Sequence, residues 1–367
     1  MSINKARKIA VIGAGIAGAA CACDLTLAGH SVHVFDKAHG PGGRLATRCV
    51  EWVDRHGQDR VTRLDHGAVG ITARSATFRT FVDQALHAGW LARWTPTLAA
   101  DSLPTEDGGR LHVPVPDMPA LCRRLLGETP VTWSFGVDSL HRSPPGWQVE
   151  AGGERHPAQF DAVVLALPPA QAAPLLGLHR RDWSRHASIV PMQPCWTLMG
   201  IADAPQAASD GHLDRPPAGP LAWVLRNDAR PGREQVPGQA HWVAHARAGW
   251  SRRHLEQPAA WVRQQLQEAL AERLGRPVDW HHCEVHRWRY ALPTAPRVAS
   301  AQPCWWDADL GLGACGDFLG GFGVEGAWLS ARSLSAALLR SVSAAADVQT
   351  AFAAQDITDR TVPRLVA

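Results

Sequence analysis

Glycines near the start of the chain have the G-x-G-x-x-G spacing that binds the pyrophosphate of a dinucleotide. The segment is Gly13-Ala14-Gly15-Ile16-Ala17-Gly18. Its first glycine permits a tight turn, the second lets backbone N–H groups approach phosphates, and the third lets a helix pack closely on a strand. The apolar run Ile9–Ile12 before it is typical of a buried strand, and a helical pattern follows from Ile16 to about Ala28. This order of elements predicts a dinucleotide site.

An acidic residue stands where such a site needs one. The run 33–36 reads as a second strand that ends in Asp36, next to Lys37. The carboxylate of Asp36 is placed to accept hydrogen bonds from an adenosine ribose. The alternative, a glycine-rich turn without a ligand, remains open on these residues alone.

Two later segments favour a flavin over a nicotinamide. Gly42-Gly43-Arg44 resembles the second fingerprint of the flavoproteins that include amine oxidases, phytoene desaturases and renalases. The run 310–317 looks like the last parallel strand of that group, whose Asp, here Asp317 after Gly316, reaches the ribityl hydroxyls. Beyond it, apolar residues at helical spacing predict a helix from Val324, whose first N–H groups would face the isoalloxazine. The resemblance implies noncovalent FAD, with contacts from Gly43, Arg44, Gly323, Val324, Glu325 and Ala327.

Composition limits the remaining classes. With 367 residues, 46% of them hydrophobic, the chain has room for two domains, and a net charge of +3 gives no case for nucleic acid. A polar start and no long apolar run lead us to expect neither a signal peptide nor a membrane span, hence a cytoplasmic protein. The eight cysteines lack C-x-x-C pairs and are expected to be reduced, buried and structural. No metal is expected at His281-His282-Cys283 and His286, because neighbouring strand positions face opposite ways.

The predicted fold class is α/β, with a Rossmann-type FAD-binding domain and a second, antiparallel-sheet substrate domain. Flavin segments at the start, middle and end imply a discontinuous cofactor domain. We assign it residues 1–71, 118–172 and 296–345, the substrate domain residues 72–117 and 173–295, and a C-terminal tail residues 346–367.

The two inserted segments are expected to form one antiparallel sheet that caps the flavin. The first holds an amphipathic helix around 78–86 and strands at 90–94 and 111–115. The second holds strands at 196–201, 221–226, 240–247 and 278–288 and a helix at 258–274, with a long exposed loop over 203–220.

An ordered set of motifs resembles bacterial renalases over about residues 8–342. These motifs are Asp65-His66-Gly67-Ala68, Thr72-Ala73-Arg74, Gln193–Trp196, Arg226-Asn227, Pro231-Gly232-Arg233, Trp242–Ala246, His286–Ala291 and Gly316–Trp328. The resemblance implies a p-hydroxybenzoate-hydroxylase-like fold. It also implies oxidation of 2- and 6-dihydro isomers of NAD(P) to NAD(P)⁺, with O₂ reduced to H₂O₂. Val69-Gly70-Ile71 stands where many members have an aromatic pair, which could widen the pocket.

Hydride transfer calls for orienting groups rather than an activated nucleophile. Asn227 and His245 are the candidates to hold a carboxamide and are treated as the catalytic pair. Candidate substrate contacts are Thr72, Arg74, Arg289, which could meet substrate phosphates, and Trp288 and Tyr290, which could line the ring site. Candidate flavin contacts are His66, Gly67, Ala68 and Val137, the last at the adenine. For Asn227, His245 and the candidate substrate contacts, a packed strand or surface residue remains the alternative, and for His66 the alternative is the cap of a turn.

Three other functions stay open. A flavin amine oxidase shares the three FAD segments, but it usually has an aromatic cage and a lysine near the flavin, whereas Tyr290 is the single tyrosine and no lysine follows Lys37. A monooxygenase is disfavoured because 317–321 departs from its expected pattern. A flavin- or nucleotide-binding protein without turnover is the third.

Overall fold

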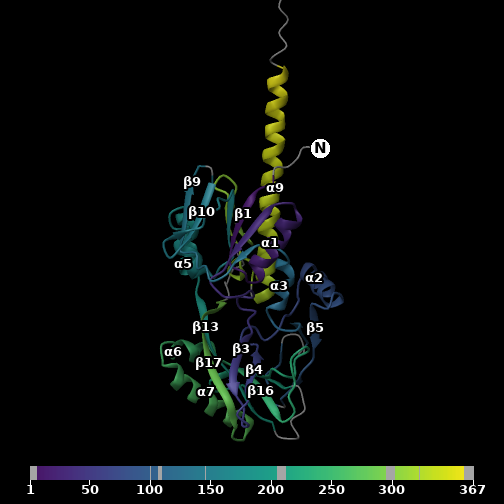
Figure 1. Cartoon of the computed structure of the whole chain (residues 1–367), viewed down its shortest axis with the longest axis vertical. Helices are drawn as coiled ribbons and strands as arrows, with labels where there is room; N and C mark the ends of the chain where they lie inside the picture. The colour runs from purple at the N-terminus through teal and green to yellow at the C-terminus, as the bar shows by residue number, and fades with distance from the viewer. Residues whose placement is uncertain are drawn as a thin grey trace, which may run out of the picture.

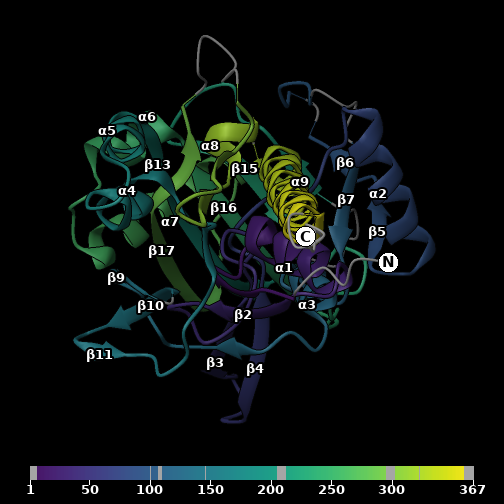
Figure 2. The ribbon, with the colours of Figure 1, turned by 90° about the horizontal axis from the view of Figure 1, so that it is seen from above.

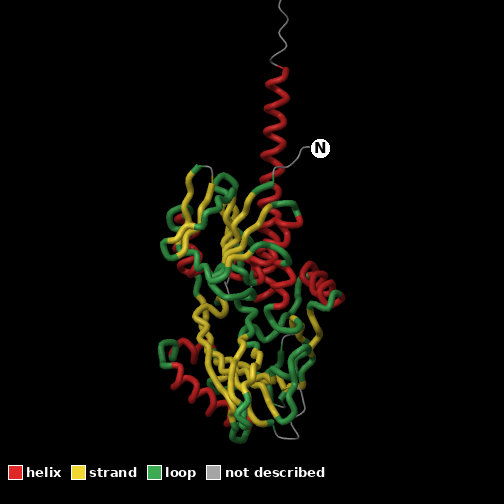
Figure 3. Tube along the Cα trace, in the orientation of Figure 1, coloured by secondary structure: helices red, strands yellow, loops and turns green. Residues whose placement is uncertain are grey.

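The computed structural model describes residues 6–99, 101–105, 110–144, 146–204, 212–294, 302–321 and 323–358. The strands gather in two groups that lie one above the other along the longest axis (Figure 3). The upper lobe holds the N-terminal strand, and the lower lobe holds the long strands of the second half of the chain (Figure 1).

The upper lobe is built on a six-stranded, mainly parallel sheet. Its order is β18-β19-β12-β1-β2-β8, for Trp305–Asp307, Leu312–Ala314, Ala162–Leu165, Lys8–Ile12, Ser31–Phe35 and Val131–Thr132. Only the β18–β19 pair is antiparallel. Alternate residues of β1 face opposite cores, because successive strand side chains point to opposite sides. Ile9 and Val11 belong to one cluster, and Ala10 and Ile12 to the other.

Helices cover both faces of this sheet. On the first face lie α1 (Ile16–Leu27), α3 (Ala120–Leu126) and α9 (Gly323–Thr358), together with α2 (Ala76–His87). Seen from above, α9 lies beside α1 (Figure 2). On the second face lie α4 (Pro169–Leu176), α5 (Arg181–Ile189) and a small sheet of β9 (Ser139–Ser143), β10 (Gly146–Ala151) and β11 (Glu154–Arg155). The short helix α8 (Asp317–Gly320) precedes α9.

The lower lobe is built on a second six-stranded sheet. Its order is β17-β13-β16-β15-β14-β6, for Trp280–Pro293, Met192–Asp203, Gln239–Ala246, Leu221–Arg226, His212–Asp214 and Thr97–Leu98. One face packs on α7 (Ala259–Leu274), with α6 (Ala248–Arg253) nearby. The other face packs on the hairpin β3 (Arg48–Val53)–β4 (Asp59–Leu64) and the ribbon β5 (Leu91–Trp94)–β7 (Leu111–Pro114). This second face carries the histidines discussed below.

The predicted fold class is confirmed, and the long strands and helices lie within a few residues of their expected bounds. The expectation of one antiparallel cap sheet is wrong in two respects. β5 and β7 form a separate two-stranded sheet, and β6 pairs with β14 in parallel. The expected loop 203–220 contains β14, with Leu213 fully buried, while its residues 205–211 lie outside the described part.

Several segments pack in a different lobe from the one that the expected domain divisions gave them. The unpredicted hairpin β3–β4, inside the expected range 1–71, packs its Val50, Trp52 and Leu64 on the lower sheet. Helices α4 and α5 extend the upper lobe past 172, and α2 packs there too. The expected division at 295/296 and residues 359–367 of the tail lie outside the described residues, whereas 346–358 continue α9, which projects from the body (Figure 1).

The state of the cysteines and the length of the helices concern two smaller expectations. All eight cysteines are free thiols, but Cys49 is exposed rather than buried. Among the described residues, no helix has the length and apolarity needed to cross a bilayer.

Candidate functional site

The first two glycine segments lie against each other at the carboxyl end of β1. Gly42 N–H donates to the Ala14 carbonyl over 3.0 Å, and Gly15 and Gly42 form an isolated parallel bridge. A Cβ on Gly18 would lie 1.8 Å from the Gly13 carbonyl oxygen, but a Cβ on Gly15 would meet nothing closer than 3.8 Å. Gly18 is therefore required by the packing of the chain itself. At Gly15 an added methyl group would make only ordinary van der Waals contacts, so the packing of the chain does not require glycine there, and the space it leaves suits a close-approaching ligand.

The N-terminus of α1 faces this space without a capping side chain from the described residues, and its first turn holds no acidic residue. Backbone N–H groups at a helix start attract anions, which suits a pyrophosphate. Asp36 lies beside it, and its two carboxylate oxygens accept from Ala14 N–H at 2.6 Å and Ala38 N–H at 2.8 Å. This cradle fits the phosphates of a dinucleotide.

Arg44 and Asp317 join the start and the end of the chain. The guanidinium donates to both carboxylate oxygens of Asp317 at 2.6 and 2.8 Å and to the Ala291 carbonyl at 3.0 Å. The Asp317 side chain is only 2% exposed. The two residues expected at the cofactor phosphates and ribityl chain thus lie together, paired with each other, at the junction of the two lobes.

The segment 66–68 packs directly on the Arg44 loop. Ala68 N–H donates to the Arg44 carbonyl at 3.0 Å, and a Cβ on Gly67 would lie 2.1 Å from the same oxygen. The His66 ring stacks on Trp288 from β17, with centroids 5.2 Å apart, and the Trp288 indole N–H donates to the His66 carbonyl at 3.1 Å. His66 therefore lies where the cofactor segments meet the lower sheet.

Three histidines cluster there without charge at neutral pH. Burial, with His286, Arg48 and His245 adding repulsion, lowers the pKa of His66 to about 3. Burial and Arg230 lower the pKa of His245 to about 4, and burial and Arg48 do the same for His286. In the described part of the chain, His66 Nδ1 and His245 Nε2 are buried with no hydrogen-bond partner. Buried polar groups normally have partners, so these two nitrogens are available to a water molecule or a ligand.

A cluster of buried charges lies beside these histidines. Asp65 is 1% exposed and pairs with Arg230 at 2.9 Å and Arg233 at 2.6 Å, while Thr47 donates a hydrogen bond to its other oxygen at 2.6 Å. These arginines hold the pKa of Asp65 below its usual value, although burial opposes them. Our sequence reasoning did not identify the cluster. The sequence feature that could have indicated it is an arginine on each side of the turn Pro231-Gly232. Only the fold shows that both arginines lie next to Asp65.

The structure changes the interpretation of three candidates. Asn227 is fully buried, and its amide accepts from Asp65 N–H and donates to the Arg63 carbonyl, both at 3.1 Å, so it holds β4 rather than a substrate. Arg289 is exposed and pairs with Glu256 at 2.5 Å, beside Arg287. The Glu325 carboxylate accepts from Arg74 N–H at 2.9 Å and Ser75 N–H at 2.7 Å, which ties α9 to the start of α2.

The other candidates are more loosely placed. Trp288, on β17, stacks on His66, and Tyr290 lies two residues further along the same strand. Val324 and Ala327 pack in the upper-lobe core. Val137 packs against the core on the opposite face, and Lys37 is exposed. Thr72 and Gly323 are only partly buried. Among the described residues, no cluster of three or more His, Cys, Asp or Glu could hold a metal ion.

Comparisons with known proteins agree with this description. Residues 11–85 match the NAD(P)-binding Rossmann-like domain family. A curated relative, the tRNA 5-methylaminomethyl-2-thiouridine biosynthesis bifunctional protein MnmC of Magnetococcus marinus, is 26% identical over 204 residues. That match covers 46% of this chain and 30% of the larger relative.

Solved structures resemble almost the whole chain. A protein from Exiguobacterium sp. 255-15 described as a protoporphyrinogen oxidase superposes with a TM-score of 0.67 at 12% identity, covering 91% of this chain and 99% of that one. Cyclohexylamine oxidase from Brevibacterium oxydans gives 0.63 at 13% identity, with 92% and 100% covered. Reduced UDP-galactopyranose mutase gives 0.64 at 11% identity, with 92% and 97% covered. The chain therefore shares its overall fold with these proteins, which carry out more than one reaction.

Proposed function

We propose that the protein is an FAD-dependent oxidoreductase with noncovalently bound FAD. The support is the convergence of segments that are distant in sequence: the start of α1, which has no side-chain cap, Gly15, where a Cβ would meet nothing closer than 3.8 Å, and the Arg44–Asp317 pair. A free-standing NAD domain has no use for the returning strand β19 and Asp317. The named fold relatives include oxidases, which favours an oxidase over a passive binding protein.

We further propose a renalase-like reaction, in which 2- or 6-dihydro isomers of NAD(P) are oxidised to NAD(P)⁺ and O₂ is reduced to H₂O₂. The observation that carries this choice is the charge of the cluster around His66. Arg48 and Arg230 both lie near enough to lower histidine pKa values, and the bordering carboxylates Asp65 and Glu284 already pair with arginines. Such surroundings disfavour an ammonium and favour a neutral ring attached to phosphates.

The residues of the cluster would position this substrate. Bound FAD supplies the hydride acceptor. Trp288, stacked on His66, offers an aromatic wall for a dihydropyridine ring. The unpartnered Nδ1 of His66 and Nε2 of His245 can bind a carboxamide, because neutral imidazoles both donate and accept hydrogen bonds. Both side chains are less than 10% exposed, at 6% and 8%, so competing water is largely excluded.

Anaerobic mixing tests the reaction. The purified protein is mixed with 2-dihydro-NAD(P), 6-dihydro-NAD(P), ordinary NAD(P)H or a panel of primary amines, and flavin absorbance is followed. We expect rapid bleaching by one or both dihydro isomers and slow or no bleaching by the others. Rapid bleaching by an amine alone would assign the protein to the amine oxidases. A yellow protein that no donor bleaches would leave only a binding function.

A matched pair of variants tests the assigned face. His245→Phe removes the unpartnered nitrogen, whereas His245→Gln keeps a donor and an acceptor. We expect the Phe variant to raise KM for the dihydro substrate about tenfold, the effect of losing roughly one hydrogen bond of 1.4 kcal/mol, and the Gln variant to recover part of it. Equal KM values in both variants and the wild type would remove His245 from the site.

A further inference from the structure

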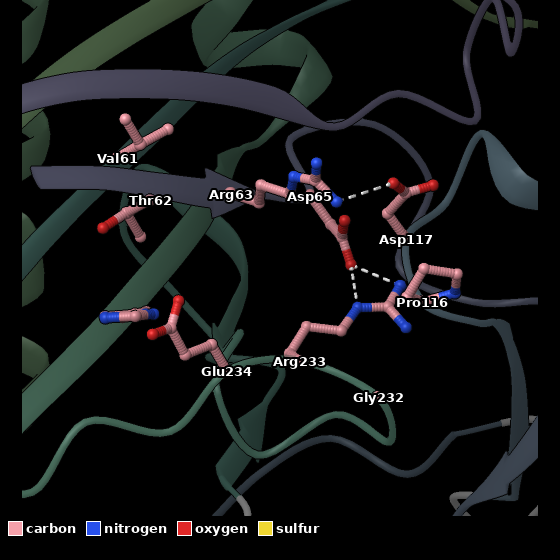
Figure 4. Close-up of a pocket in the computed structure, with 10 residues that line it drawn as sticks. Val61, Thr62, Arg63, Asp65, Pro116, Asp117, Gly232, Arg233 and Glu234 are labelled. Carbon is pink, nitrogen blue, oxygen red and sulfur yellow. Dashed lines mark hydrogen bonds and ion pairs between the residues drawn. The ribbon is translucent and has the colours of Figure 1, made fainter.

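The arginines around the histidine cluster differ in how firmly a carboxylate holds them. Arg230 and Arg233 are buried and pair with Asp65 at 2.9 and 2.6 Å, and Figure 4 shows the Arg233–Asp65 pair. Arg48, from β3, is 38% exposed, and its Nη1 lies 3.4 Å from both carboxylate oxygens of Glu284. Charge-assisted hydrogen bonds are usually about 2.7–2.9 Å long, so this ion pair is loose. Arg48 therefore has N–H groups left for a second partner.

That second partner is the ring of His286, on β17. Nη2 of Arg48 lies 3.2 Å from Nδ1 of His286, and because a guanidinium has only N–H donors, Nδ1 must accept this hydrogen bond. The ring is neutral at pH 7, since burial and the charge of Arg48 lower the pKa of His286 to about 4. A neutral imidazole has one N–H, which must then be on Nε2. Arg48 therefore fixes the tautomer of His286.

His286 lies against the two rings that form the proposed ring site. Glu284, His286 and Trp288 alternate along β17 and share one face of the strand. The His286 ring stands roughly perpendicular to the stacked rings of His66 and Trp288, with centroids 4.7 and 4.4 Å away. Nδ1 of His66 and Nε2 of His245 are buried, whereas Nε2 of His286 is reached by solvent and makes no hydrogen bond within the described residues. The N–H of His286 is therefore a donor available to a ligand.

We propose that His286 is a third substrate-binding side chain, which donates its Nε2–H to the carbonyl oxygen of the substrate carboxamide, and that Arg48 is the positioning residue that keeps the proton on Nε2. This inference rests on the renalase-like function proposed above. A carbonyl oxygen can only accept a hydrogen bond, so a lone pair on Nε2 would repel it. The hydrogen bond at one ring nitrogen of a histidine decides which form the other nitrogen presents. Arg48 thus acts on the substrate through His286.

Steady-state oxidation of 2- or 6-dihydro-NAD(P) by the flavin-loaded protein tests the contact of His286. Glutamine places its amide near the position of Nε2, whereas asparagine places it near that of Nδ1. We expect His286→Asn to raise KM about tenfold with little change in kcat, the effect of losing roughly one hydrogen bond that is present throughout the reaction, and His286→Gln to recover most of this loss. Unchanged KM in both variants, or equal rises in both, would overturn the contact. Oxidation of neither isomer by the wild type would overturn the renalase-like function, and this inference with it.

Two substitutions of Arg48 test its positioning role. Arg48→Lys keeps a side chain that only donates hydrogen bonds, whereas Arg48→Met removes the donor. We expect Arg48→Met to raise KM about as much as His286→Asn, and Arg48→Lys to raise it less. In the His286→Gln protein, Arg48→Met should have little further effect, because glutamine has no tautomer to fix. The same rise in KM in both backgrounds would mean that Arg48 acts independently of His286, and would overturn its assigned role.

Nitrogen NMR of protein labelled at histidine determines the tautomer without any substrate. The ring signals that disappear in His286→Gln identify His286. At pH 7 we expect the proton on Nε2 in the wild type and a mixture of the two tautomers in Arg48→Met. A wild-type ring with its proton on Nδ1 would overturn the inference and leave the renalase-like function unaffected.

Discussion

The two faces that meet at the junction of the lobes are built in different ways. On the upper face, backbone groups of the glycine segments and the start of α1 form the candidate cofactor site, and side chains contribute little beyond Asp36 and the Arg44–Asp317 pair. On the lower face, the site consists of imidazole and indole side chains supported by buried charges. A backbone site tolerates change in the side chains around it, whereas a side-chain site depends on every neighbour that fixes its charge.

Removal of the Asp65 carboxylate is expected to have the largest effect, because the lower face depends on this buried charge. Asp65→Asn leaves Arg230 and Arg233 buried without a counter-charge, and we expect the free energy of unfolding to fall by about 3–5 kcal/mol, as when a buried ion pair loses one partner. Urea unfolding measures the change. Asp59→Asn, the same substitution on an exposed residue of β4, is the control. A small loss in Asp65→Asn, matching the control, would mean that the buried arginines need no carboxylate.

Substitution of two glycines of the upper face distinguishes an effect on packing from an effect on ligand binding. In Gly18→Ala the new Cβ would lie 1.8 Å from the Gly13 carbonyl oxygen, so the loop must shift, and we expect about 3 kcal/mol of lost stability. In Gly15→Ala the nearest atom is 3.8 Å away, so stability should change by less than about 0.5 kcal/mol. Flavin retention should nevertheless fall in Gly15→Ala. Thermal unfolding and flavin content measure both effects, and full flavin content in Gly15→Ala would contradict the proposed phosphate position.

The histidine cluster predicts acid sensitivity of the lower face. Unfolded histidine has a pKa near 6.5, but burial lowers the pKa of His66 to about 3 and of His245 to about 4 in the folded chain. The unfolded state therefore binds more protons below pH 6.5, so stability is complete above that pH and decreases as the pH falls toward 4. We expect a loss of about 1–2 kcal/mol per histidine between pH 7 and pH 5.

Urea unfolding at pH 5, 6 and 7 measures this loss. His66→Gln removes one of the titrating rings, so its stability should depend less on pH than that of the wild type. If the wild type is equally stable at pH 5 and pH 7, the cluster is not buried as described, and the charge argument for a neutral substrate ring loses its basis.

The same contrast explains what the sequence could predict. The strand, turn and helix around Gly13–Gly18 follow from local rules, so β1, α1 and the meeting of the glycine segments agree with expectation. Four strands of the lower sheet, β13, β15, β16 and β17, were also predicted, because their patterns are local, whereas β6 and β14 were not. Asn227 directly follows the predicted strand 221–226, but its partners, the backbone at 63 and 65, lie at the end of a hairpin that was not predicted. A side chain's role depends on neighbours that are distant in sequence.

Substitution of Arg289 is expected to have the smallest effect, and it shows where the motif and the structure disagree. Its place in the motif 286–291 suggested contact with substrate phosphates, but its guanidinium pairs with Glu256 on the exposed side of β17. The neighbouring Trp288 faces His66 instead. We expect Arg289→Gln to leave the KM for the dihydro substrate and the free energy of unfolding unchanged, because exposed ion pairs contribute little. Trp288→Ala should raise KM in the same assay, since it removes the wall beside His66. A raised KM in Arg289→Gln would show that the Arg289–Glu256 ion pair opens when substrate binds. The contact suggested by the motif would then be correct, although the structure shows the arginine paired with Glu256.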